Sequence, residues 1–257
     1  MSPWRVAWIT GASQGIGRAL ALGLARQGVA VAASARSEAK LAALCAEARD
    51  LPGAIHSYPL DVTDAAAGED LLQRLSAERG LPDLVILNAG THQPTPAQSF
   101  RSEDLRRILE LNVIGVANGL QSVLPPMLAR GGGQVAVVAS LAGYRGLPTA
   151  AAYGASKAAL INLCEALRLD LHGSGVKLQL INPGFVRTPL TDRNPFPMPF
   201  LVDAEVAAAR IIRGLRGSGF EIRFPTPFAL IMGLLRHLPY SLYLPLVRRL
   251  TQTDKTR

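Results

Sequence analysis

Short apolar runs alternate along the chain with longer segments of helical periodicity. The short runs have the length and composition of strands, and several are apolar at almost every position, as strands covered on both faces are. The longer segments repeat apolar residues at helical spacing. The predicted strands are 5–10, 29–35, 55–62, 84–90, 134–140 and 177–182, with a last short run at 220–225, and the predicted helices are 15–27, 37–49, 64–79, 102–129, 151–172 and 203–216.

This alternation of strand and helix predicts an α/β fold. Repeated strand–helix–strand units give right-handed crossovers and a parallel sheet with helices on both faces. We expect a single Rossmann-like, doubly wound sheet of about seven strands in the order 3-2-1-4-5-6, since no internal repeat or linker divides the chain. Residues 1–225 form the predicted nucleotide-binding domain, and residues 226–257 form an apolar helical extension.

Composition narrows the functional classes. The 257 residues are 49% hydrophobic, which suits one domain with a full core. The net charge of +8 is spread along the chain without a dense basic block, so nucleic acid is a disfavoured partner. Cys45 and Cys164 are predicted to be buried free thiols in a reducing compartment. The first residues read as a strand and not as a signal peptide, which predicts a cytoplasmic protein.

A glycine-rich loop follows the first predicted strand. In "TGASQGIGRAL", Gly11, Gly15 and Gly17 lie where the strand turns into a helix. One glycine permits the turn, one lets the backbone approach a pyrophosphate, and one permits close packing of helix and strand. Free N–H groups at the helix start then bind the anion. The loop therefore predicts a dinucleotide site, with a purely structural turn as the alternative.

The end of the second strand bears on the choice of dinucleotide. An acidic residue there would bind the adenosine ribose 2′-hydroxyl and repel a 2′-phosphate. This chain has Ser34, Ala35 and Arg36 instead. A guanidinium can bind a phosphate through several donors. The sequence thus favours NADP(H), with NAD(H) as the alternative and a solvated Arg36 as the competing interpretation.

A tyrosine and a lysine are spaced for one helix face in "AAYGASKAAL". Tyr153 and Lys157 are four residues apart, so their side chains lie one above the other. A nearby ammonium favours the phenolate and lowers the phenol pKa from its usual value. Such a tyrosine can donate a proton to a carbonyl oxygen or remove one from an alcohol.

The order of these motifs resembles that of the short-chain dehydrogenase/reductase family. The resemblance covers nearly all of residues 4–225. It rests on "TGASQGIG", "LDVTD", "LNAG", "LNVIG", "VVASLAG", "YGASK" and "INPGFVRT". By this resemblance the catalytic residues are Asn112, Ser140, Tyr153 and Lys157. Ser140 would bind the substrate oxygen, Lys157 would also bind the nicotinamide ribose, and Asn112 would hold a water of a proton relay.

The resemblance also implies a set of cofactor contacts. Asp61 and Val62 would flank the adenine, and Val186 would lie near the carboxamide. Gln14 departs from the family pattern, because many NADP-using relatives have a basic residue there. The complete predicted cofactor site is Gly11, Ser13, Gln14, Gly15, Ile16, Gly17, Arg36, Asp61, Val62, Asn88, Ala89, Gly90, Tyr153, Lys157, Pro183, Gly184, Val186 and Thr188.

Residues 189–200 correspond in the family to a mobile substrate lid. Their prolines, phenylalanines and methionine suggest an apolar substrate, or else packing of the loop itself. Tyr144 and Leu147 are further candidates for the substrate wall, and His92 could approach the site. The four histidines show no metal-ligand spacing, so no metal is predicted.

The extension at 226–257 leaves three interpretations open. Its apolar runs, broken by Arg236, Pro239 and Pro245, are too short to span a bilayer. It could cover the substrate pocket, pack on a second subunit, or lie on a membrane surface with its arginines near lipid phosphates. The sequence modestly favours the first two, and the family resemblance implies a homodimer or homotetramer.

The combined prediction is an NADP(H)-preferring oxidoreductase. It would interconvert a carbonyl and a secondary alcohol on a small apolar substrate, with a fatty acyl, steroid-like or retinoid-like carbonyl as examples. The alternative is a non-catalytic NADP(H)-binding sensor or scaffold that docks a partner or a membrane through the extension. An extended sugar-nucleotide epimerase is disfavoured by the chain length and the glycine spacing.

Overall fold

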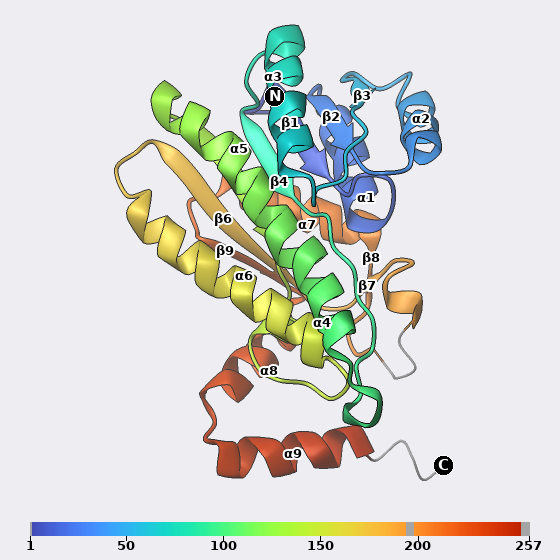
Figure 1. Ribbon diagram of the computed structural model, residues 1–257, viewed down its shortest axis with the longest axis vertical. Coiled ribbons are helices and arrows are strands. Elements are labelled where there is room, and N and C mark those ends of the chain that lie inside the picture. Colours follow the sequence, from blue (N-terminus) through green and yellow to red (C-terminus); the bar gives the residue numbers. More distant parts are fainter. Residues whose placement is uncertain (1, 194–197, 253–257) are drawn as a thin grey trace.

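One parallel seven-stranded sheet organises the chain. The computed structural model describes residues 2–193 and 198–252. The strand order is β3-β2-β1-β4-β5-β6-β9, and every adjacent pair is parallel (Figure 1). The strands are β1 Val6–Thr10, β2 Ala30–Ser34, β3 Ile55–Ser57, β4 Leu84–Leu87, β5 Gly133–Val138, β6 Val176–Pro183 and β9 Glu221–Phe224.

The predicted fold class and strand order are confirmed. The last predicted run becomes β9, which extends the sheet beyond β6. β3 is shorter than the predicted 55–62, and Pro59, which has no N–H to donate to a ladder, follows soon after its end. A small second sheet pairs β7 (Val186–Arg187) with β8 (Val202–Asp203), and the sequence pattern did not predict it.

Helices cover both faces of the sheet, which buries two separate apolar layers. Alternation along β1 shows the division: Ile9 packs in one layer with α1, α2 and α7, and Trp8 packs in the other with α3, α5 and α6. Figure 1 shows the second group in front of the sheet. The α-helices are α1 Gly15–Ala25, α2 Glu38–Glu47, α3 Ala65–Arg79, α4 Ser102–Leu109, α5 Gly115–Arg130, α6 Ala151–Asp170, α7 Ala204–Arg216, α8 Thr226–His237 and α9 Tyr240–Gln252.

The helix predicted at 102–129 is interrupted. Residues Glu110–Ile114 form a π-helical turn, η2, between α4 and α5. Its residues "ELNVI" are compatible with an ordinary helix, so the pattern gave no sign of the wider turn. π-helical turns occur often at functional sites, and this one carries the buried side chain of Asn112.

The extension is helical, as predicted, and it consists of two helices separated at Leu238–Pro239. The Tyr243 hydroxyl donates to the Gly146 carbonyl at 2.6 Å, which fixes α9 against the loop that precedes α6. In the part of the chain that the structure describes, no helix is long and apolar enough to cross a membrane. Residues 253–257 of the predicted extension lie outside the described residues.

The two cysteines differ in environment. Cys164 is buried, as predicted, and burial raises the pKa of its thiol to about 12. Cys45 is only partly buried, which corrects the prediction for that residue. It lies on α2, where it packs against the edge of the core and borders a surface pocket.

A short 3₁₀ turn, η3 (Leu141–Gly143), packs directly against α6, which predicts an effect on stability. A Cβ on Gly143 would lie 2.7 Å from the Lys157 backbone carbonyl carbon and 2.9 Å from the Ala158 nitrogen. Since backbone atoms cannot move aside, we expect Gly143→Ala to lower the free energy of unfolding by about 1–3 kcal/mol in urea titrations. Gly146→Ala is the matched control, because a Cβ there meets nothing within 4 Å; equal stability of the two variants would contradict this packing.

Candidate active site

A cleft of about 500 Å³ opens where several parallel strands end. Gly11 follows β1, Ala35 follows β2, Asn88 follows β4 and Ser140 follows β5, and Pro183 ends β6. The carboxyl edge of such a sheet is where α/β proteins bind their ligands, because the chain diverges there to opposite faces. The topology therefore brings residues from distant parts of the sequence to one cleft.

The glycine loop packs so closely on itself and on the end of β4 that a side chain at Gly11 or Gly17 would have no room. A Cβ on Gly17 would lie 2.3 Å from the Gly11 carbonyl oxygen, and one on Gly11 would lie 2.8 Å from the Ala89 Cα. Gly11 also has φ +66°, a conformation that favours glycine. The loop therefore presents bare backbone to the cleft at the start of α1, which suits a pyrophosphate.

Hydrogen bonds of Asn88 connect this loop to the end of β4. Its side-chain amide donates to the carbonyl oxygens of Thr10 and Gly11 at 3.0 and 3.2 Å. In return, the Thr10 hydroxyl accepts from the backbone N–H groups of Asn88 and Ala89. Asn88 thus lines the cleft and also holds the glycine loop in place.

Two basic side chains line the end of the cleft beside β2. Arg36 and Lys40 both lie there, at the amino-terminal end of α2. The Lys40 ammonium donates to the Gln14 side-chain oxygen at 3.1 Å. Asp61 lies in the same region, where hydrogen bonds from the Thr63 backbone N–H and hydroxyl, with the charge of Arg36, hold its pKa below the usual value.

Lys157 joins α6 to the end of β5. Its ammonium donates to the Val138 carbonyl at 2.8 Å and lies 5.7 Å from the centre of the Tyr153 ring. Across the cleft floor, Ser140 donates to the Pro183 carbonyl at 3.3 Å and accepts from the Ala142 N–H at 3.1 Å. Tyr153, Lys157 and Ser140 therefore meet at one end of the cleft.

The electrostatics of this cluster differ from the prediction. Burial raises the pKa of Tyr153, and the hydrogen bond with Ser140 acts in the opposite direction. Burial also lowers the pKa of Lys157 from 10.5 to about 8. The net shift of the Tyr153 pKa is therefore upward, opposite to the predicted lowering, because burial penalises the phenolate.

Asn112 lies behind the cleft and not on its surface. Its side-chain oxygen accepts from the Thr91 N–H at 2.7 Å, and its side-chain nitrogen donates to the Thr91 carbonyl and to the Ser156 hydroxyl at 2.9 and 3.0 Å. A Cβ on Gly90 would lie 3.2 Å from the Asn112 oxygen and 3.6 Å from the Lys157 nitrogen. Asn112 and Lys157 thus face the same glycine from two helices.

The substrate-side candidates are only partly brought together. His92 packs edge-on against Tyr153, with ring centres 4.8 Å apart. Tyr144 and Leu147 do not line the cleft; the Tyr144 hydroxyl donates to Glu221 and its ring packs in the core. Among the lid residues, 189–191 line the cleft, whereas Asn194, Pro195, Phe196 and Pro197 lie outside the described residues.

Most of the predicted site residues share this one cleft. Every predicted cofactor residue lines it except Gly17, which packs beneath the loop, and three of the four predicted catalytic residues line it. Lys40 was not predicted. Its position in the first turn of α2, close in sequence to Arg36, was the available signal. The other lining residues that were not predicted are Ala35, Ser37, Leu60, Thr91, Leu111, Val138 and Ala139, whereas Pro189, Leu190 and Thr191 belong to the predicted lid.

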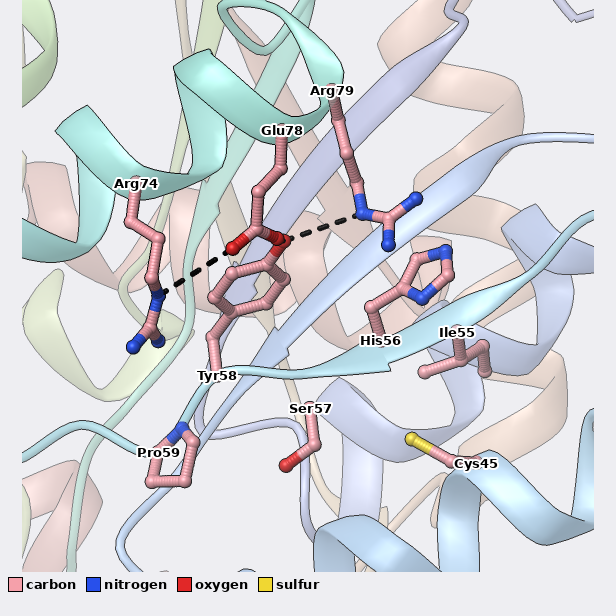
Figure 2. A pocket seen from close by; sticks show the side chains of 9 residues that line it. All are labelled: Cys45, Ile55, His56, Ser57, Tyr58, Pro59, Arg74, Glu78 and Arg79. Carbon is pink, nitrogen blue, oxygen red and sulfur yellow. Dashed lines mark hydrogen bonds and ion pairs between the residues drawn. The ribbon is translucent and has the colours of Figure 1, made fainter.

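A second pocket lies between α2, β3 and α3 (Figure 2). Its polar side chains bind one another: the Tyr58 hydroxyl donates to Glu78, and Arg79 donates to the Tyr58 oxygen at 3.2 Å. Arg74 lies 4.0 Å from Glu78 and covers the Tyr58 ring. These contacts form a surface network. No group of three or more potential metal-binding His, Cys, Asp or Glu side chains occurs in residues 2–193 and 198–252.

Comparisons with known proteins agree with this geometry. The model of the short chain dehydrogenase family matches residues 5–195. An uncharacterized oxidoreductase of Myxococcus xanthus is 43% identical over 247 residues, which cover 96% of this chain and 98% of that protein.

Solved structures with the same fold carry nicotinamide dinucleotides. A short-chain dehydrogenase/reductase from Burkholderia phymatum, in complex with NAD, has a TM-score of 0.83 at 26% identity and covers 91% of this chain and 92% of its own. An alcohol dehydrogenase from Thermococcus sibiricus, complexed with 5-hydroxy-NADP, has a TM-score of 0.77 at 26% identity, with coverages of 86% and 95%. The chain described here belongs to the short-chain dehydrogenase/reductase family and is an oxidoreductase.

Proposed function

We propose that this oxidoreductase uses NADP(H) to interconvert a carbonyl and a secondary alcohol on an apolar substrate. The observation that carries the proposal is the meeting of Tyr153, Lys157 and Ser140 at one end of a cleft that is also lined by a bare glycine loop. The loop fits a dinucleotide, since it packs too closely for side chains at Gly11 and Gly17, where a Cβ would collide with the Ala89 Cα and the Gly11 carbonyl oxygen. When bound, the nicotinamide would supply or accept the hydride.

The side chains at this end of the cleft would transfer the proton, orient the substrate oxygen and bind the cofactor. Tyr153 gives a proton to the substrate oxygen in reduction and removes it in oxidation. Burial raises the pKa of Tyr153, so near neutral pH the phenol is in the protonated form that reduction requires. The Ser140 hydroxyl orients the substrate oxygen, and Lys157 binds the nicotinamide ribose. Asn112 orients Thr91 and Ser156 around Lys157, and we assign it a water of the proton relay.

The preference for NADP(H) rests on charge at the adenosine end. Arg36 and Lys40 place two cations where an acidic residue would exclude a 2′-phosphate. Lys40 also accounts for the departure at Gln14, because its ammonium is hydrogen-bonded to that side chain. A basic group thus reaches the glycine loop from α2. The apolar substrate is inferred from Pro189 and Leu190 at the cleft and from Phe200 beyond them.

The extension and the assembly enter as proposals too. We place residues 1–225 as the catalytic domain and 226–257 as an appendage to it. Phe228 of α8 stacks on Phe185 at 5.4 Å, next to the cleft residue Gly184, which supports the interpretation that α8 closes the substrate side. A cytoplasmic homodimer or homotetramer through α5 and α6 follows from the family alone.

Replacing the proposed proton donor tests the chemistry. We expect Tyr153→Phe to lower turnover of apolar ketones and aldehydes by about 100- to 10,000-fold while the NADPH dissociation constant stays near that of the wild type. Wild-type turnover in this variant would overturn the mechanism. Tight NADPH binding by the wild-type protein with no turnover on any carbonyl of the panel would favour the non-catalytic sensor instead.

Two charge deletions test the choice of cofactor. We expect Arg36→Leu and Lys40→Leu each to weaken NADPH binding by about tenfold or more in calorimetric titrations, and to leave NADH binding unchanged, because only NADPH carries the 2′-phosphate. Arg26→Leu, an exposed arginine after α1 and outside the cleft, is the matched control. If the ratio of NADPH affinity to NADH affinity were unchanged in both cleft variants, other residues would be responsible for the cofactor preference.

The proposed role of Lys157 requires a protonated ammonium at neutral pH. The pH dependence of the free energy of unfolding can detect this buried charge. Its pKa of about 8 lies below the 10.5 of an exposed lysine, so the unfolded chain binds the proton more tightly between these values and folding is favoured as the pH rises. We expect the wild type to gain about 1 kcal/mol of unfolding free energy relative to Lys157→Met between about pH 7 and pH 9. Parallel pH profiles of the two proteins would contradict a buried ammonium.

A further inference from the structure

The outward face of the extension is unusually apolar. In the part of the chain that the structure describes, eight of the fourteen exposed large hydrophobic residues lie between positions 230 and 250. A patch of this kind on a monomer marks an interaction site more often than chance exposure does. We define the outer tail face as these eight residues: Leu230, Ile231, Leu234, Tyr240, Leu242, Leu244, Leu246 and Leu250.

This face belongs to helices that are already folded against the protein. On α8 the side opposite the exposed leucines is buried at Ala229 and Met232, and on α9 Tyr243 and Val247 are buried between the exposed side chains. The Arg145 guanidinium lies 4.5 Å from the ring centres of both Tyr240 and Tyr243, and it donates to the Arg236 carbonyl at 2.7 Å. The apolar residues therefore remain outside after α8 and α9 have packed on the domain.

Helical spacing groups these residues into stripes. Leu230 and Leu234 are one turn apart on α8, with exposed fractions of 60% and 69%. Leu242, Leu246 and Leu250 follow one another at four-residue intervals along α9. Figure 1 shows α9 lying across the lower end of the molecule, beneath α8 and away from the sheet. Both stripes thus belong to the helices at the lower end of the molecule in this view.

The charge of the same segment is entirely positive. Between Glu221 and Asp254 the sequence contains no Asp or Glu, whereas Arg236, Arg248 and Arg249 lie within or beside the outer tail face. Arg236 has one acidic neighbour, Glu165 of α6, at 3.9 Å. Apolar side chains accompanied by arginines, with an exposed tyrosine such as Tyr240, match the boundary layer of an anionic bilayer.

We propose that the outer tail face docks this protein on an anionic lipid surface. The helices would lie in the interface, because none of those described combines the length and the apolar character needed to cross. A second copy is the less favourable occupant: a two-fold contact would place the same arginine-bearing helices, whose sequence has no Asp or Glu between Glu221 and Asp254, against themselves. Phe228, at the start of α8, stacks on Phe185 beside the cleft, so docking would bring the substrate side near the bilayer.

Co-sedimentation with lipid vesicles tests the docking directly, and it does not depend on the proposed chemistry. We expect the full chain to sediment with phosphatidylglycerol–phosphatidylcholine vesicles, to remain in solution with phosphatidylcholine alone, and to be released by high salt. Leu234→Ser with Leu246→Ser should weaken binding by at least about tenfold. Leu169→Ser, which changes a 77% exposed leucine on α6, is the matched control and should bind as the wild type does.

Charge reversal distinguishes electrostatic binding to anionic lipid from nonspecific hydrophobic adsorption. Arg248→Glu with Arg249→Glu should abolish the preference for anionic vesicles, whereas the same reversal at Arg210 and Arg213, two exposed arginines of α7, should not. Circular dichroism and urea unfolding verify that each variant is folded. A full chain that ignores anionic vesicles would overturn the proposal. So would a Leu234→Ser, Leu246→Ser protein whose sedimentation-velocity mass falls to that of a smaller assembly, since the face would then be a subunit contact.

Discussion

The hydrogen bond from the Lys157 ammonium to the Val138 carbonyl joins the two halves of the site. Val138 ends β5, and Ser140 follows it two residues later. Lys157 is on α6, one turn after Tyr153. Because the ammonium is buried, its position is set by this carbonyl and by the neighbouring Gly90 and Asn112. The distance between strand and helix therefore fixes how Ser140 and Tyr153 face each other, and the packing of Gly143 on α6 keeps that distance short.

Much of the fold could be predicted because its signals are local. Apolar runs such as β4 and β5 identify buried parallel strands wherever they occur, and right-handed crossovers then leave few strand orders. The glycine loop and the Tyr153–Lys157 pair are also local, since each lies within one turn or one helix. The cleft residues follow from topology, because the carboxyl ends of parallel strands must lie together.

What could not be predicted depends on contacts between distant residues. The π-helical turn at Asn112 forms where that side chain binds Thr91, which is twenty-one residues away along the chain. Lys40 binds Gln14, which is twenty-six residues away along the chain. The sequence therefore suggested that the glycine loop has no basic group beside it, whereas the structure places the Lys40 ammonium there. The raised pKa of Tyr153 depends on burial by its surroundings, and helix spacing alone does not reveal it. The outer tail face required knowing which side of α8 and α9 packs inward.

The edges of the sheet have a consequence for aggregation. An open strand edge can pair with another chain, and proteins that avoid this keep edge strands short or charged, or interrupt them with proline. β3 has three residues and is followed by Pro59, while β9 has four, two of them the charged pair Glu221 and Arg223, and is followed by Pro225. Neither edge offers a long ladder of free N–H and carbonyl groups. At high local concentration, chains of this protein would therefore resist strand-to-strand polymerisation.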